Sequence, residues 1–503
     1  MTVAPVDIPR IEAPVTAKAY LMCAFSAFAG ALFGYDSGYI ASVLPMKQFT
    51  LAYGTPSHGQ YDLVAWQKGV VVGILSVGTF CGALISGVLA DRIGRRSTIL
   101  VGCAIFATGV ALQISITTVA ALSLGRLVAG LGVGFVSAIN ILYLCEVAPR
   151  KVRGAIISLY QFAITLGLLL ASCVGYATKD RTDRLAFGIP IGVQFIWALI
   201  LAVGLYLLPE SPRYFVKRGD LPRAVAALSR LRGQPQDSHA LQDELAEIQA
   251  NYEYEQHVGL ESWRGCFAGR LADRSSNMRK LFIGMCIQML QQFSGINFVF
   301  YYNTTFFQII GIRQPFIVSI INNLVNVIST PVSFYTIERF GRRPLLIYGA
   351  LGMSACEFAI AAVWTRDPAS PASNLVLIIF SCVYIFFFAS TWGPAAWVVV
   401  GEIFHLPIRA KGVAISTASN WFWNAVIASF TPLLVEDAAS SGRDLGGRVY
   451  FIWGSTCLLA ALFAFALVPE TKGLTLEQVD QMMDEVGPLH SARWRVRVTA
   501  HDL

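Results

Sequence analysis

The chain has 503 residues, of which 55% are hydrophobic and only 14% are charged. So few polar side chains could not cover a soluble protein of this composition, which favours a membrane protein with several spans. The formal net charge of +7 comes from 38 Lys and Arg residues against 31 Asp and Glu residues.

Apolar segments of about 20 residues recur along the chain, each long enough to cross a hydrocarbon core of roughly 30 Å as a helix. Helices are expected because lipid offers no partner to a free backbone amide. The predicted spans are 19–46, 64–90, 97–116, 119–145, 154–176, 188–208, 279–310, 315–337, 344–364, 375–402, 410–435 and 448–468. The spans that begin at 19, 279 and 375 are long and contain Gly or Pro, which predicts breaks where backbone lines a cavity. The sequence thus predicts an all-α membrane protein with twelve transmembrane helices.

A polar, helix-prone stretch that includes L-Q-D-E-L-A-E-I-Q separates the first six spans from the last six. It is too polar to enter a bilayer, so short cytoplasmic helices are expected there. The predicted organisation is an N-terminal cytoplasmic tail, a six-helix bundle, a helical linker, a second six-helix bundle and a C-terminal cytoplasmic tail, over residues 1–18, 19–208, 209–278, 279–468 and 469–503.

Basic residues concentrate in alternate short loops on one side of the predicted membrane. They are Arg92, Arg95, Arg96, Arg150, Lys151, Arg153, Arg339, Arg342, Arg343, Arg409 and Lys411. Such loops mark the cytoplasmic side, which places both termini inside the cell. The first apolar run lacks the features of a cleavable signal, so it is expected to remain as a span.

Metal and enzyme chemistry find no support in the sequence. Nine of the ten cysteines lie in apolar runs, as small buried hydrophobic residues do, and the six histidines show no metal-ligand spacing. No paired catalytic carboxylates, nucleophile elbow or phosphate loop stands out. We expect no cofactor, no metal and no nucleic-acid partner.

Three loop motifs occur twice, in the same order, in the two halves of the chain. D-R-I-G-R-R at 91–96 returns as E-R-F-G-R-R at 338–343, E-V-A-P-R-K-V-R-G at 146–154 as E-I-F-H-L-P-I-R-A-K-G at 402–412, and P-E-S-P-R at 209–213 as P-E-T-K-G at 469–473. Two similar halves with a site at their interface are typical of secondary transporters that alternate between inward and outward states.

These motifs, together with Q-Q-F-S-G-I-N at 291–297, resemble the sugar porter family of the major facilitator superfamily over nearly the whole chain. L-Y-Q-F-A-I-T-L-G at 159–167 and the run after residue 291 are most similar to the proton-coupled monosaccharide (hexose) transporters of fungi. The resemblance implies two pseudo-symmetric six-helix bundles in the plasma membrane, functional as a monomer, that carry a glucose-like sugar.

The resemblance also implies a cytoplasmic gate, an ionic network that locks this side while the protein faces outward. Its residues are Asp91, Arg95, Glu146, Arg153 and Glu210 in the first half and Glu338, Arg342, Glu402, Arg409 and Glu470 in the second. Because a surface ion pair contributes only about 0 to 1 kcal/mol, several are needed to bias the equilibrium. The alternative is that the basic residues only fix the topology.

A neutral sugar requires hydrogen-bond groups that donate and accept, with aromatic faces for its ring. By resemblance, the contacts come from Gln161, Gln291, Gln292, Asn297, Asn326, Asn420 and Asn424, with Trp397 and Trp421, while Phe33, Tyr301 and Tyr302 close over the sugar. In an unbroken helix Gln292 and Asn297 would point about 140° apart, so unwinding at Ser294 and Gly295 is expected to bring them together. The alternative is that the amides bridge helices, the role we assign to Asn322 and Asn323.

Asp36 is an ionisable residue inside the first span, which makes it a functional candidate. The family's proton-coupled members imply Arg126, in the fourth span, as its partner, whereas facilitators tend to carry Asn in place of Asp36. We expect a proton on Asp36 to weaken its pairing with Arg126, which lets the outer half of the seventh span close over the sugar. The alternative is a static ion pair between two helices.

Three other functions are compatible with the same fold. An uncoupled facilitative uniporter would differ from a proton symporter only in the absence of the proton step. A sugar-sensing receptor of the fungal type would carry a long cytoplasmic tail, and the stretch after Gly473 is short. A polyol or quinate-like acid is a possible substrate, and glucose, galactose, xylose and fructose are not separated by these residues.

Overall fold

The computed structural model describes residues 16–57, 60–115, 118–148, 153–258, 263–309, 311–367, 370–404, 406–435, 446–474 and 476–494. These residues are almost all helical, apart from one short antiparallel hairpin of β1 (Thr55–Ser57) and β2 (Gln60–Asp62). Nine helical segments among them are long and apolar enough to span a membrane. The three remaining predicted spans are α1 with α2, α13 with α14, and α19, which completes a fold of twelve transmembrane helices.

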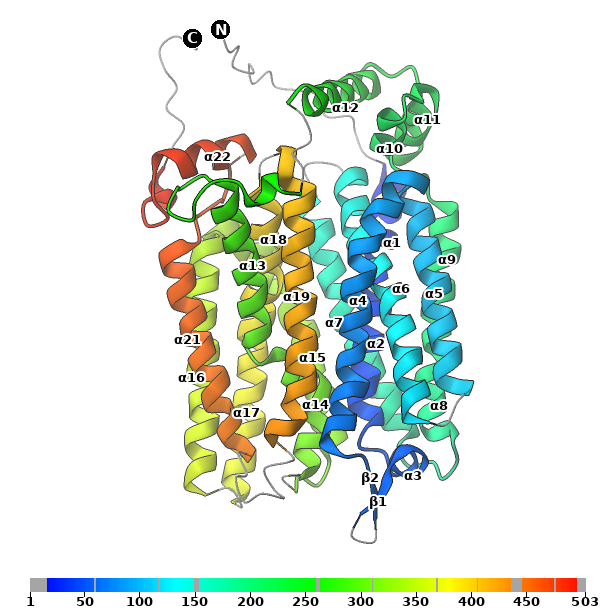
Figure 1. Ribbon diagram of the computed structural model, residues 1–503, viewed down its shortest axis with the longest axis vertical. Coiled ribbons are helices and arrows are strands. Elements are labelled where there is room, and N and C mark those ends of the chain that lie inside the picture. The colour runs from blue at the N-terminus through cyan, green and yellow to red at the C-terminus, as the bar shows by residue number, and fades with distance from the viewer. Residues whose placement is uncertain are drawn as a thin grey trace.

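The first half of the chain forms one group of helices (Figure 1). Its members are α1 (Ala17–Ala27), α2 (Ala29–Val43), α3 (Lys47–Tyr53), α4 (Ala65–Ile93), α5 (Arg95–Ser115), α6 (Val119–Val147), α7 (Arg153–Thr178), α8 (Leu185–Gly192) and α9 (Gln194–Leu207). The linker that follows contains α10 (Pro212–Lys217), α11 (Leu221–Arg232), α12 (His239–Val258) and the turn η2 (Gly265–Phe267).

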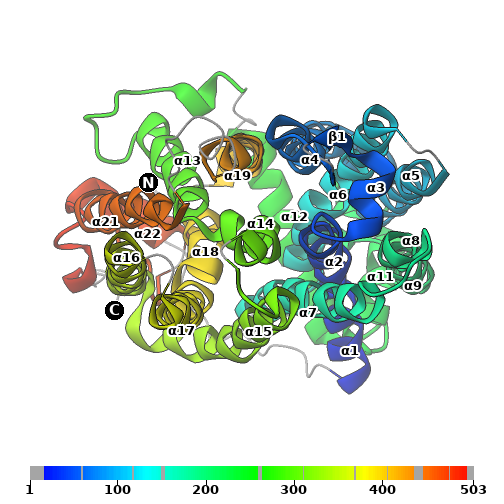
Figure 2. The ribbon, with the colours of Figure 1, turned by 90° about the horizontal axis from the view of Figure 1, so that it is seen from below.

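The second half forms a second group beside the first. Its members are α13 (Asn277–Phe293), α14 (Ile296–Ile309), α15 (Pro315–Phe340), α16 (Arg342–Arg366), α17 (Pro371–Phe387), the π-helical turn η3 (Phe388–Trp392), α18 (Gly393–Glu402), α19 (Leu406–Val435), η4 (Gly446–Arg448), α21 (Val449–Leu467), α22 (Leu476–Glu485) and η5 (Ser491–Arg493). Seen along the helices, the two groups lie side by side as two bundles (Figure 2).

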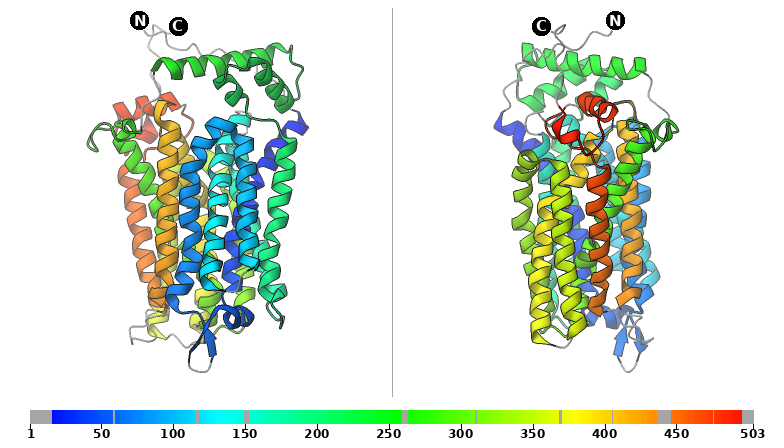
Figure 3. Two further views of the ribbon diagram at one scale, coloured as in Figure 1. Left: turned by 45° about the vertical axis from the view of Figure 1, so that its right-hand side comes forward. Right: turned by 90° about the vertical axis from the view of Figure 1, so that its left-hand side faces the viewer.

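The linker and tail helices cover one end of the molecule, where α10–α12 and α22 all lie (Figures 1 and 3). We call this the basic end, because the repeated Arg-rich motifs are there, and the opposite end with β1 and β2 the hairpin end. The linker helices share a small apolar core that contains Val216, Leu228 and Leu241. This core lets the linker fold outside the membrane spans.

Local signals in the sequence set the limits of these helices. The Ser276 hydroxyl accepts a hydrogen bond from the Arg279 amide at 3.2 Å, and so caps α13. The Asp220 carboxylate does the same for α11 through the Arg223 amide at 3.2 Å. Such side chains bind amides of the first helical turn that have no partner within the helix.

Two of the three predicted breaks are confirmed, at Phe28 in the first span and at Ser294 and Gly295 in the seventh. In the tenth span the helix continues through a π-helical turn just before Gly393 instead of being interrupted. Another break, between α8 and α9 at Val193, was not predicted. It follows Pro190, which has no amide hydrogen to donate within the helix.

Candidate functional site

Five amide side chains from α13 and α19 form a hydrogen-bonded network in the second bundle. Asn420 Nδ2 donates to Oε1 of Gln288 at 2.7 Å and to Oε1 of Gln291 at 2.9 Å. Asn424, one turn further along α19, donates from Nδ2 to Oε1 of Gln292 at 3.3 Å. All five side chains are buried, so these bonds offset the cost of removing amides from water.

The break in the seventh span adds Asn297 to the amide network. Gly295 has a φ of +83°, a left-handed conformation that glycine adopts without strain. The chain turns there, and Asn297 Nδ2 donates a hydrogen bond to Oε1 of Gln292. The expectation that unwinding at Ser294 and Gly295 would bring these two amides together is therefore confirmed.

The amide network also contacts the first bundle. Asn424 Oδ1 accepts a hydrogen bond from the Ser76 hydroxyl of α4 at 2.7 Å and from the Tyr301 hydroxyl of α14 at 3.3 Å. Beside it, the rings of Phe33 in α2 and Trp421 in α19 meet edge to face with centroids 5.1 Å apart. The predicted polar and aromatic residues thus meet at the interface of the two bundles.

Other predicted sugar contacts lie outside this network. Tyr302 donates to the carbonyl of Ala428 at 2.6 Å, which ties α14 to α19. Gln161 in α7 and Trp397 in α18 are half-buried, and Asn326 in α15 is buried. None of these three side chains is hydrogen-bonded to the network among the described residues.

The two bundles are in close contact toward the hairpin end. A Cβ atom added at Gly69 of α4 would lie 2.3 Å from the Ser429 carbonyl of α19, and one added at Gly73 would lie 2.1 Å from the Ser429 hydroxyl. On the other flank, Asn323 of α15 donates to the Ser172 hydroxyl of α7 at 2.6 Å. Asn323, to which we assigned a structural role, thus joins the two bundles.

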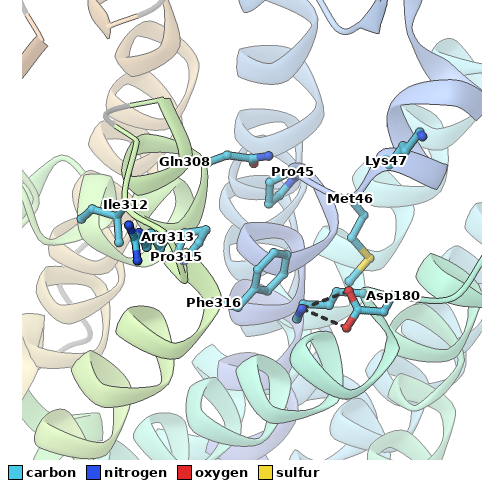
Figure 4. Close-up of a pocket in the computed structure, with 10 residues that line it drawn as sticks. Pro45, Met46, Lys47, Asp180, Gln308, Ile312, Arg313, Pro315 and Phe316 are labelled. Atoms are coloured by element: carbon cyan, nitrogen blue, oxygen red, sulfur yellow. Dashed lines mark hydrogen bonds and ion pairs between the residues drawn. The ribbon is translucent and has the colours of Figure 1, made fainter.

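A groove of about 280 Å³ lies at the hairpin end, where α2, α7, α14 and α15 converge (Figure 4). Lys179 is paired with Asp180 at 2.9 Å and lies 5.8 Å from the centroid of the Phe316 ring, so it contacts both bundles. The groove contains none of the predicted sugar contacts. It lies at the hairpin end of the interface between the bundles, apart from the amide network.

Asp36 is fully buried in α2, and neither of its carboxylate oxygens has a hydrogen-bond partner among the described residues. Arg126, also fully buried, instead donates to the Tyr39 hydroxyl at 2.5 Å. Tyr39 in turn donates to Oε1 of Gln113 at 2.6 Å. The direct ion pair implied by the resemblance is therefore not formed here. Tyr39 binds one nitrogen of the guanidinium, and Nε and Nη2 of Arg126 have no hydrogen-bond partner among the described residues.

The predicted gate residues of the first bundle form an ionic cluster at the basic end. Arg95 binds Glu146 at 3.1 Å and Asp91 at 3.5 Å. Its backbone amide and that of Arg96 donate to Oε1 of Glu210, at 2.9 and 3.1 Å. Glu210 thereby caps the start of α5, where a carboxylate is stabilised by the helix dipole.

The second bundle repeats this arrangement. Arg342 binds Glu402 at 2.9 Å and Glu338 at 3.4 Å, and the amides of Arg342 and Arg343 donate to the Glu470 carboxylate at 3.0 and 3.1 Å. These ion pairs join side chains within one bundle. The side chain of Arg153 lies outside the described residues, and Arg409 is half-buried near the start of α19.

Two residues of the amide site, Gln288 and Ser76, and one buried acid outside it, Glu357, were missed from the sequence. Gln288 lies one turn before Gln291 and could have been found by helical spacing. Glu357 is an ionisable residue inside the predicted span 344–364, so the rule that selected Asp36 applies to it as well. Ser76 carried no signal, because a serine in an apolar helix usually binds its own backbone.

Comparison with known proteins identifies the family. Residues 22–483 match the family model described as sugar (and other) transporter. The chain is 42% identical to the major facilitator-type transporter ecdD of Aspergillus rugulosus, over 96% of this chain and 90% of that protein. It is also 42% identical to the probable glucose transporter rco-3 of Neurospora crassa, over 97% of this chain and 83% of that protein.

Among solved structures, the fold is similar to that of the proton:xylose symporter XylE bound to 6-bromo-6-deoxy-D-glucose. The TM-score is 0.76 and the identity 28%, with 93% of this chain and 99% of the other covered. The fold and the site thus define a multi-pass membrane transporter, not an enzyme. The chain belongs to the sugar porter family of the major facilitator superfamily.

Proposed function

We propose that this protein carries a neutral monosaccharide, most suitably a glucose-like hexose, across the plasma membrane together with a proton. The observation that carries the proposal is the buried amide network of Gln291, Gln292, Asn297, Asn420 and Asn424. Each amide can both donate and accept, as sugar hydroxyls do, so a sugar can take over bonds that the amides now make to one another. The named activities of rco-3 and XylE support this substrate class.

The position of the network supports transport by alternating access. It lies where α14 and α19 face α4 and α2 of the other bundle, and the bundles meet closely toward the hairpin end. We assign the basic end to the cytoplasm, which places both termini there, because of its Arg and Lys residues. In this state the outer side is closed, and the cytoplasmic clusters would gain contacts across the bundles when that side closes.

The surroundings of Asp36 support proton coupling. A buried carboxylate without partners is costly in its charged form, so the arrangement suits a protonated Asp36. Tyr39 gives the buried Arg126 one hydrogen bond in this state, and the remaining nitrogens of the guanidinium are available to Asp36. When the proton leaves, Arg126 can return to Asp36, and the change of partner links the proton to the movement of α2 against α6.

We expect Tyr39→Phe to shift the pH dependence of sugar uptake to lower pH by about one unit, the effect of losing one hydrogen bond. Without the Tyr39 hydroxyl, Arg126 pairs with Asp36 more readily and favours its charged form, so more acid is needed to protonate it. Initial uptake rates across a pH series check this. Tyr35→Phe is the matched control, because Tyr35 binds the Pro190 carbonyl instead. A Tyr39→Phe profile identical to that of wild type would contradict the exchange of partners.

The proposed function is tested by radiolabelled uptake in cells that lack their own hexose transporters. We expect accumulation of glucose or a related hexose above the external concentration, alkalinisation of the medium during uptake, and loss of accumulation with a protonophore. Equilibration without accumulation would instead indicate an uncoupled uniporter. Binding of sugar without any uptake would indicate a receptor, and uptake of polyols or quinate alone would overturn the monosaccharide assignment.

A further inference from the structure

A second buried acid, Glu357 of α16, lies outside the machinery described so far. It is 1% exposed, and the neighbouring positions on its helix face, Met353, Ile360 and Ala361, are all buried and apolar. Its Oε2 atom has no hydrogen-bond partner, and the side chain forms no ion pair with any described residue. An apolar side chain of similar size could be buried here without the free-energy cost of removing a carboxyl group from water, which suggests that the carboxyl group has a role.

Glu357 lies directly behind the break in the seventh span. A Cβ atom added at Gly295 would be 3.1 Å from Oε1 of Glu357 and 2.8 Å from Cγ of Trp453. The two side chains therefore form the wall against which the left-handed backbone of Gly295 rests. The Ser354 hydroxyl, one turn earlier on α16, donates to the Gly454 carbonyl at 2.8 Å and holds α16 close to α21.

Side chains from neighbouring helices bind the backbone carbonyls that the break leaves free. The Ser294 carbonyl accepts from the Tyr384 hydroxyl at 2.8 Å and from the Cys457 thiol at 3.7 Å. The Phe293 carbonyl accepts from the Thr456 hydroxyl at 2.5 Å. We call Glu357, Tyr384, Trp453, Thr456 and Cys457 the hinge socket, because they surround the point where α13 passes into α14.

Glu357 is buried and no cation among the described residues is paired with it, so a negative charge at this place would be costly. The titratable side chains that face it from the packed helices are Tyr384 of α17 and Tyr450 and Cys457 of α21, and Cys356 is its neighbour on α16. None of them carries a positive charge. A neutral carboxyl can donate and accept at once, so it can adjust to the thiol of Cys457 and the indole of Trp453 as the backbone moves.

We propose that Glu357 is a positioning residue of the transport cycle, a neutral acid that supports the Ser294–Gly295 break as the hinge on which α14 moves against α13. The inference rests on the proposed transport by alternating access and deepens it. Glu357 does not contact the amide network. It acts through the backbone of Gly295, so its loss should slow the conformational step more than it weakens sugar binding.

Three variants test this proposal. Glu357→Gln keeps the shape and both kinds of hydrogen-bond group, and we expect its maximal uptake rate and pH profile to match those of wild type within about twofold. Glu357→Leu removes the polar groups at similar size, and we expect the maximal rate per transporter to fall about tenfold with a smaller change in KM. Ser354→Ala is the matched control, because it loses a bond of the same helix interface without touching the break.

A second measurement does not depend on the substrate. Spin labels attached through click-reactive amino acids at Lys47 and Gln308, which line the groove from opposite bundles, report opening of the hairpin end. We expect two distance populations in wild type and in Glu357→Gln, with exchange between them suppressed or one of them lost in Glu357→Leu.

The outcomes separate this proposal from the proposed function. If Glu357→Gln loses proton-driven accumulation, the acid titrates during transport and the neutral hinge is wrong. If Glu357→Leu behaves as Ser354→Ala does in both rate and distance populations, the acid only fills space. A wild-type protein that moves no monosaccharide would contradict the proposed function, and the distance populations would still decide the role of the hinge.

Discussion

An Asp36→Asn transporter is expected to equilibrate labelled sugar across the membrane but not to concentrate it. The amide matches the neutral form of the carboxyl, so the sugar site and the closed hairpin end persist, while no proton is bound or released. One proton moved through 100 mV supplies about 2.3 kcal/mol, enough for roughly fifty-fold accumulation of a neutral solute, and this entire factor should disappear.

The measurement compares net accumulation with the exchange of labelled for unlabelled sugar at equal concentrations. Asp183→Asn is the matched control, since Asp183 is an exposed acid of the same bundle, paired with Arg181 at 2.9 Å. We expect it to accumulate sugar as wild type does. Uphill accumulation by Asp36→Asn would show that protons are coupled elsewhere or not at all.

The second large effect is expected from Gln292→Leu. Oε1 of Gln292 accepts hydrogen bonds from both Asn297 and Asn424, so this amide connects the two sides of the break to α19. Leucine has a similar size and no polar atom. If Gln292 binds the sugar as proposed, leucine removes its hydrogen bonds to the ligand, at about 1 to 3 kcal/mol for each buried group. We expect the KM for sugar to rise about 10- to 100-fold.

The control for this variant is Asn322→Leu. Asn322 is also a buried amide of the second bundle, but its Oδ1 accepts from the Cys382 thiol at 3.2 Å, a contact between helices. We expect lower abundance of that variant with an unchanged KM. If Gln292→Leu likewise changes only abundance, the amides are bridges between helices and the sugar site lies elsewhere.

Much of the fold followed from the apolar lengths and the repeated motifs. Departures from a regular helix were predictable where Gly295 and the Gly393–Pro394 pair lie, because both stand within apolar segments longer than one membrane span requires. The break at Val193 was missed because Pro190 lies only a few residues inside its span, where it reads as part of the helix start.

Pairing between side chains was less predictable. Asp36 stands out as an ionisable residue within a span and Arg126 is implied by the family resemblance, but no pattern in the sequence places the Tyr39 hydroxyl on the guanidinium. Likewise Asn424 was selected for its amide, whereas its bond to Ser76 depends on the distance between α4 and α19. Contacts of this kind arise from the packing of whole helices, which residue spacing within one helix does not determine.

The meeting of α4 and α19 at Gly69, Gly73 and Ser429 has a consequence for the energy of the cycle. At Gly69 the backbone of α4 lies close to the Ser429 carbonyl, and at Gly73 it faces the Ser429 hydroxyl, so small groups make this contact between the bundles. A contact made by small groups can separate and re-form with a small change in free energy in either direction. The free energies of the outward and inward forms can therefore stay within a few kcal/mol of each other, so that binding of one sugar and one proton can shift the equilibrium between them.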